Sequence, residues 1–215
     1  MKATEVLRSL SDVTASQWGM VTTAQAAARG VTRMNLSRLA RDGHLERLGH
    51  GVYRAAAAPT SRFSGVKAAW LSIAPTLTAE ARLLAPVPDA VVSGTTAAHV
   101  LSLGDMVPEP YEFTVPTRRQ TQRYELVFKT AHLPPQSITI RDGLWVTTPE
   151  QTIADLVEHR IDRSLVAGVL ADVDSLDRER LAVLLAPLAQ RNGFRPGDGE
   201  AFRTELERLA GREHS

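Results

Sequence analysis

Cysteine is absent from the 215 residues, and no long apolar run occurs. Without cysteine there is no disulfide, no thiol nucleophile and none of the commonest ligands of structural zinc. The longest apolar stretch, residues 181–189, is interrupted by Pro187 and is too short to span a bilayer. The first ten residues also lack the apolar segment of a secretory signal. We therefore expect a cytoplasmic protein that does not associate with a membrane.

Side chains in catalytic arrangements are equally scarce. The six histidines include no pair at a helical spacing of three or four residues, which disfavours a metal site. No phosphate-binding glycine loop occurs, and the paired aspartates of a nucleotidyltransferase are missing. Glu125 and Lys129 differ in spacing from the Glu-x-Lys strand of a nuclease, and Asp155 and Glu158 have the spacing of a solvent-exposed pair on a helix. We expect no catalytic residue, no metal, no cofactor and no enzymatic activity.

The first quarter of the sequence has the pattern of a helix-turn-helix followed by a hairpin. Thr22 and Thr32 stand at the N-cap positions of two short helices, and Gly30 between them supplies a sharp turn. Two short strands, 44–48 and 52–54, then flank a Gly-His-Gly tip. This order predicts a winged helix-turn-helix, which is a DNA-binding module.

The second of these helices has an apolar side and a basic side. At 100° per residue, Leu36 and Leu39 lie on one side and the arginines on the other, where they are free to enter a major groove. The competing interpretation is an ordinary solvated helix face. The predicted DNA-binding residues are Arg33, Met34, Ser37, Arg38 and Arg41 of the helix, with Arg47, His50 and Arg54 of the hairpin on phosphates. Met34 either contacts a thymine methyl group or fills a gap against the first helix, and both remain open.

The distribution of charge supports a nucleic-acid partner for the N-terminal part alone. Residues 1–60 carry eight basic and four acidic side chains. The whole chain has 25 basic and 24 acidic side chains, which leaves 17 basic and 20 acidic side chains for the remainder. Only the N-terminal part therefore has the net positive charge that attracts a polyanion.

A composition change at residues 55–61, AAAAPTS, predicts a linker and two domains: a winged helix-turn-helix DNA-binding domain at 1–56 and an α+β domain at 61–215. The second domain is expected to hold a small, largely antiparallel sheet, in which Asp142-Gly143 is a strong hairpin signal. Thr148 is expected to cap the helix that follows the sheet. Its other expected helices are 66–74, 78–84, 95–103, 163–172, 177–190 and 199–209, and its expected strands are 111–115, 124–130, 137–141 and 144–147.

Four segments resemble one known family. They are LERLGHGVYR at the end of the winged helix, VVSGTTAAHVLSLG, EFTVP and DGLWVTTPEQTIADL. Together they are similar to the AbiEi antitoxins of abortive-infection, type IV toxin–antitoxin systems, and the likeness covers most of the chain. The matching residues of the second and fourth segments are Ser93, Ala97, Ala98, His99, Thr148, Pro149, Glu150, Thr152 and Asp155.

The resemblance implies an antitoxin with no catalytic role of its own. Its winged helix would bind operator DNA with inverted repeats and repress its own operon. Its C-terminal domain would counteract a cognate nucleotidyltransferase-like toxin, either directly or indirectly. The alternatives are a transcriptional regulator of other genes with a ligand-sensing C-terminal domain, and an enzyme with a DNA-binding appendage.

Overall fold

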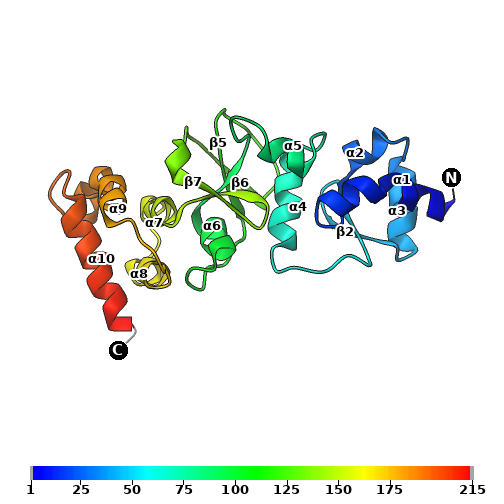
Figure 1. The fold of residues 1–215 in the computed structure, drawn as a ribbon. Coiled ribbons are helices and arrows are strands. Elements are labelled where there is room, and N and C mark those ends of the chain that lie inside the picture. Colours follow the sequence, from blue (N-terminus) through cyan, green and yellow to red (C-terminus); the bar gives the residue numbers. More distant parts are fainter. Residues whose placement is uncertain (1, 214–215) are drawn as a thin grey trace. The chain divides into compact units, whose positions relative to one another are not determined.

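The structure is a computed structural model that describes residues 2–213 and side chains as far as Gly211 (Figure 1). The chain divides into two compact units, Met1–Asp89 and Ala90–Ser215. Within residues 2–213, no helix combines the length and the apolar character that a bilayer span requires.

The first unit contains the predicted helix-turn-helix and hairpin, preceded by a helix and followed by two more. Its elements are α1 (Ala3–Ser16), β1 (Met20–Thr22), α2 (Thr23–Ala27), α3 (Arg33–Arg41), β2 (Leu45–Gly49), β3 (Val52–Ala55), α4 (Ser64–Ile73) and α5 (Ala79–Leu83). The three strands form an antiparallel sheet in the order β1-β3-β2. Val6, Leu10 and Val13 of α1 share one helix face and are buried with Leu36 and Leu39 of α3 in a single apolar core.

Helices α4 and α5 belong to the first unit, so the division between units differs from the predicted linker at residues 55–61. The loop between the two helices and the first residue of α5 supply hydrogen-bond partners to two buried glutamines. Gln25 donates to the carbonyl of Leu77 (Nε2 to O 2.7 Å), and Gln17 accepts from the amide of Ala79 (N to Oε1 3.2 Å). Buried amides need such partners, because an unpaired one costs the free energy of its lost hydration. The AAAAPTS segment is therefore a connection inside a compact unit.

The second unit is a mixed sheet with helices, which confirms the predicted α+β class. Its elements are β4 (Val91–Val92), α6 (Gly94–Leu101), β5 (Tyr111–Val115), β6 (Leu126–Thr130), β7 (Ile138–Arg141), β8 (Leu144–Thr147), α7 (Pro149–Glu158), α8 (Arg163–Ala171), α9 (Arg178–Leu185) and α10 (Gly199–Glu213), with short 3-10 turns at Pro135–Ser137, Ala186–Leu188 and Gln190–Asn192. The strand order is β6-β5-β4-β8-β7. Pair β7–β8 is antiparallel, as the Asp142-Gly143 hairpin signal predicted. Pair β4–β5 is also antiparallel, although β4 was not among the expected strands, and pairs β5–β6 and β4–β8 are parallel.

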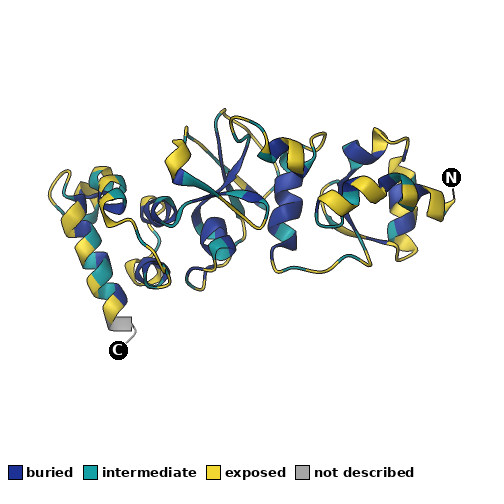
Figure 2. Ribbon diagram, viewed as in Figure 1, coloured by how far each residue is buried: buried dark blue, intermediate teal, exposed yellow. Residues whose placement is uncertain are grey.

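The main core of the second unit lies among its helices (Figure 2). Phe202 and Leu206 of α10 are fully buried together with apolar residues of α7, α8 and α9. Gly199, the first residue of α10, lets that helix begin against α9, because a Cβ atom at this position would lie 1.9 Å from the carbonyl oxygen of Ala182. The predicted C-terminal helices are present, and they pack together around this core.

Candidate nucleic-acid interface

Helix α3 is fixed at its start and along its inner side. The Thr32 hydroxyl accepts a hydrogen bond from the amide of Asn35 (3.2 Å), which caps the helix as predicted. Gly30 adopts a φ of +74°, the left-handed conformation that the turn before α3 requires. Leu36 and Leu39 are completely buried. This anchoring determines which side of the helix faces solvent.

The outer side of α3 carries all five helix residues that the sequence predicts for DNA binding. Arg33, Met34, Ser37, Arg38 and Arg41 are all exposed, and they are called the α3 face below. Four of them, with Asn35, line a hollow of about 500 Å³. Met34 has 79% of its surface exposed, so it does not fill a gap against the first helix. The α3 face is an exposed, basic surface with an apolar side chain in its first turn.

The wing, formed by β2 and β3 and their connection, presents two further predicted residues. Arg47 and His50 are exposed near its tip, and the Arg47 Nε donates to the carbonyl of Gly49 (3.3 Å). The amide and the hydroxyl of Thr23, at the start of α2, donate to the carbonyl of Gly51 at 2.7 and 3.2 Å. The tip of the wing is therefore tied to the helix-turn-helix.

Arg54 does not occupy the position that the sequence predicts for it. Its guanidinium is buried, with a residue exposure of 6%, and it pairs with Glu46 across the two strands (Nη2 to Oε2 2.5 Å). A second contact reaches the hydroxyl of Ser64 in α4 (3.5 Å). Strand β3 is the central strand of its sheet and is packed by α4, so its side chains are buried on both faces. Arg54 is thus an internal ion-pair partner in this structure, and the phosphate contact predicted for it is wrong here.

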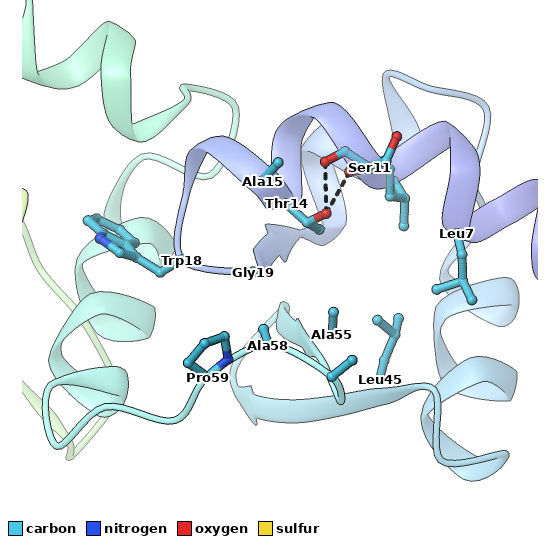
Figure 3. A pocket seen from close by; sticks show the side chains of 12 residues that line it. Leu7, Ser11, Thr14, Ala15, Trp18, Gly19, Leu45, Ala55, Ala58 and Pro59 are labelled. Atoms are coloured by element: carbon cyan, nitrogen blue, oxygen red, sulfur yellow. Dashed lines mark hydrogen bonds between the residues drawn. The ribbon is translucent and has the colours of Figure 1, made fainter.

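An open apolar groove of about 530 Å³ lies between α1 and the residues around the wing (Figure 3). Leu7 and Thr14 of α1 face Leu45 and Ala55 across it, and Trp18 lies at one end. The hydroxyl of Thr14 donates to carbonyls of its own helix at 3.0 and 3.1 Å. The groove therefore presents mainly apolar surface beside the strand that leads into the wing.

Comparison with known families identifies the segment that carries the α3 face and the wing. Residues 8–56 match the family described as "Transcriptional regulator, AbiEi antitoxin". This confirms the predicted family over that segment. No curated protein sequence matches the chain.

The fold as a whole has a counterpart among solved structures. The crystal structure of the Rv2827c protein from Mycobacterium tuberculosis is similar with a TM-score of 0.58 and 17% sequence identity. The similarity covers 97% of this chain and 78% of that chain. At this identity the likeness concerns the fold, and it extends over both compact units.

Several of the family-like residues in the second unit serve to build its structure. Thr148 caps α7 by accepting from the amide of Gln151 (3.5 Å), and the Thr147 and Thr152 hydroxyls share a hydrogen bond of 2.7 Å. Glu150 accepts from the amide of Asp177 at the start of α9 (3.0 Å). These contacts join α7 to strand β8 and to α9. Thr148, Glu150 and Thr152 of the fourth family-like segment therefore have structural contacts within the second unit.

Asp155 is buried, whereas the sequence suggested that it would be exposed to solvent. It is 1% exposed and accepts from Lys129 on β6 (3.1 Å) and from Gln151 (3.1 Å). Burial raises the pKa of Asp155 above its ordinary value, and the Lys129 ammonium opposes this effect. Lys129 also contacts Glu158, which is the more exposed of the two carboxylates. The sequence signal for this contact was a lysine, Lys129, that follows three apolar residues of a short strand.

A second ion pair fastens the end of α7 to the neighbouring strand. Nδ1 of His159 lies 3.0 Å from Oε2 of Glu112 on β5, and Glu112 also accepts from the amide and hydroxyl of Thr95 on α6 (3.1 and 2.6 Å). The bond to Glu112 raises the pKa of His159, although burial opposes the effect. Burial also opposes the lowering of the Glu112 pKa by His159 and Thr95. Among the described residues, no three potential ligands are grouped as a metal site requires.

Proposed function

We propose that the chain is a transcriptional regulator of the AbiEi type that binds operator DNA through the α3 face and the wing. The α3 face carries the proposal, because its arginines project from a helix whose opposite side is locked into a core. The family description of residues 8–56 supports the same assignment. Docking such a helix in the major groove brings its N-terminal residues to the base edges.

Each part of the interface has a chemical task in this proposal. Arginine donates two parallel hydrogen bonds to guanine, so Arg33, Arg38 and Arg41 are suited to read base edges. Arg47 and His50 on the wing contact phosphates, which positions the module without reading sequence. Inverted repeats would place two copies of the module on one operator, and the resulting occupancy would repress the protein's own operon.

The second unit is proposed to act as an antitoxin against a nucleotidyltransferase-like toxin, in the cytoplasm and without catalysis of its own. Its partly buried ion pairs and capped helices hold a unit that is separate in sequence from the α3 face. Neutralisation by this unit and repression by the first unit are therefore separable activities of one chain.

A mobility-shift titration of the full chain with the DNA upstream of its gene tests the DNA-binding proposal. Arg38→Ala should weaken specific binding by about 1–3 kcal/mol, because one base-reading arginine is lost. The matched control is Arg208→Ala, which removes an exposed arginine paired with Glu205 on α10. Unchanged affinity of Arg38→Ala would contradict the assignment of the α3 face.

Co-expression with the adjacent gene tests the antitoxin proposal separately. A chain with Arg33→Ala and Arg38→Ala, made from an unrelated promoter, should still rescue growth, because the second unit is intact. Co-purification of the two proteins would indicate direct contact. Failure of the unmodified chain to rescue growth would contradict the antitoxin function and leave the DNA-binding proposal standing.

A further inference from the structure

Met34 is an apolar side chain placed among arginines and left in water. Its 79% exposure is in the range of the most exposed large apolar residues of the first unit, such as Leu84 at 78%. Unlike Leu84, it stands on the face of a helix that is otherwise polar or charged. Leaving such a side chain in water forgoes the stabilisation that burial would bring. A single exposed apolar side chain is ordinary on a protein surface, so the significance of Met34 depends on where it stands on α3.

The place of Met34 on α3 indicates where its apolar contact with a partner would lie. At 100° per residue, Ser37, Arg38 and Arg41 all fall within about 60° of Met34 around the helix axis. These four residues line the same hollow of about 500 Å³. Met34 is the second residue of α3, so it belongs to the turn that approaches base edges most closely when a recognition helix enters a major groove.

The major groove offers one common apolar feature to such a side chain, the methyl group on C5 of a pyrimidine. A methionine suits this target, because its unbranched, polarizable side chain adapts its shape to a small apolar group. We propose that Met34 is a specificity-determining residue that recognises the C5-methyl group of a pyrimidine in each half-site. This inference depends on the proposed DNA binding by the α3 face. The methyl group belongs either to thymine or to 5-methylcytosine.

The test uses the full chain and the duplex that it selects from a random-sequence pool. Each thymine of the site is replaced in turn by deoxyuridine, which removes only the methyl group. Replacement at one thymine per half-site should weaken binding about fourfold, which corresponds to the ~0.8 kcal/mol of one buried methyl group. If the methyl group belongs to 5-methylcytosine, methylation of one cytosine should instead strengthen binding by a similar factor.

Variants at position 34 assign the effect to this residue. Met34→Ala should bind the methylated and unmethylated duplexes equally, whereas Met34→Leu should keep the preference because it remains apolar. Since the side chain is exposed, neither variant should change the unfolding transition. A methyl preference that persists in Met34→Ala would overturn the inference.

The remaining outcomes separate this inference from the proposed function. Tight and sequence-selective binding with no methyl effect at any pyrimidine would overturn the role of Met34 and leave DNA binding intact. A chain that selects no sequence from the pool would overturn the proposed function, and the role of Met34 with it.

Discussion

The pair formed by Arg54 and Glu46 should respond asymmetrically to mutation, because its two members differ in exposure. The Arg54 side chain is 7% exposed and the Glu46 side chain 52%. Removing Glu46 leaves a guanidinium buried without its carboxylate, and its Nε already has no partner among the described residues. Removing Arg54 leaves a carboxylate that water can hydrate. Truncation of the exposed partner should therefore cost more than truncation of the buried one.

The expected magnitudes follow from the cost of an uncompensated buried charge. Breaking a buried pair by removing one partner costs about 3–5 kcal/mol, and the partial exposure of Glu46 places Glu46→Ala near the lower end, at about 3 kcal/mol. Arg54→Met keeps the apolar stem and removes the charge, so we expect a loss of about 1 kcal/mol. Glu46→Gln keeps one acceptor oxygen, so its loss of stability should lie between those of Glu46→Ala and Arg54→Met.

Urea unfolding of the full chain measures this difference, in a Trp145→Phe background so that the fluorescence of Trp18 and Trp70 reports on the first unit. DNA affinity is measured in the same variants under conditions where each is folded. Arg54→Met should bind DNA almost as well as the unmodified chain. Lost DNA affinity in a fully stable Arg54→Met, or a larger destabilisation by Arg54→Met than by Glu46→Ala, would refute the reasoning and return Arg54 to the DNA surface.

Two further predictions concern backbone strain and pH. Gly19→Ala should destabilise the first unit by roughly 2–4 kcal/mol, because φ is +76° and a Cβ atom would lie 2.2 Å from that of Ala58. Gly30→Ala, at a φ of +74° with open space around it, should cost only about 1 kcal/mol; equal costs in thermal unfolding would contradict this argument. His159 has a raised pKa. Its pair with Glu112 therefore stabilises the folded state fully below the ordinary histidine pKa of 6.5, and this stabilisation is lost as pH rises through the raised pKa. Glu112 has a lowered pKa. Its contribution to the free energy of unfolding is therefore fully present above its ordinary pKa of 4.5 and is lost as pH falls through the lowered pKa. His159→Gln should flatten the stability profile above about pH 6.5, and an unaltered profile there would exclude the pair as its cause.

The helix-turn-helix was predictable from the sequence because its signals are local. Thr22 and Thr32 cap their helices through contacts three residues away, and Gly30 makes the turn between them. The exposed side of α3 followed from helical periodicity alone. Such features depend on a few neighbouring residues, so the chain does not need to be folded to reveal them.

Features that depend on distant residues were missed or misplaced. Helix α1 was not among the expected elements, although Val6, Leu10 and Val13 have helical spacing. The burial of Arg54 requires α4 to cover its strand, and the burial of Asp155 requires a lysine 26 residues earlier in the chain. The parallel strand pairs likewise follow from long-range topology. Neither the partner nor the covering element is visible in a local pattern.

The salt dependence of DNA affinity tests the central claim most directly, since that claim gives α3 and the wing different roles. The full chain, Arg38→Ala and Arg47→Ala are titrated with the selected duplex and with an unrelated duplex at several salt concentrations. Arg38→Ala should lose affinity for the selected duplex only, whereas Arg47→Ala should weaken binding to both and lower the salt slope by about one. Unchanged affinity and slope in both variants would contradict DNA binding through this surface.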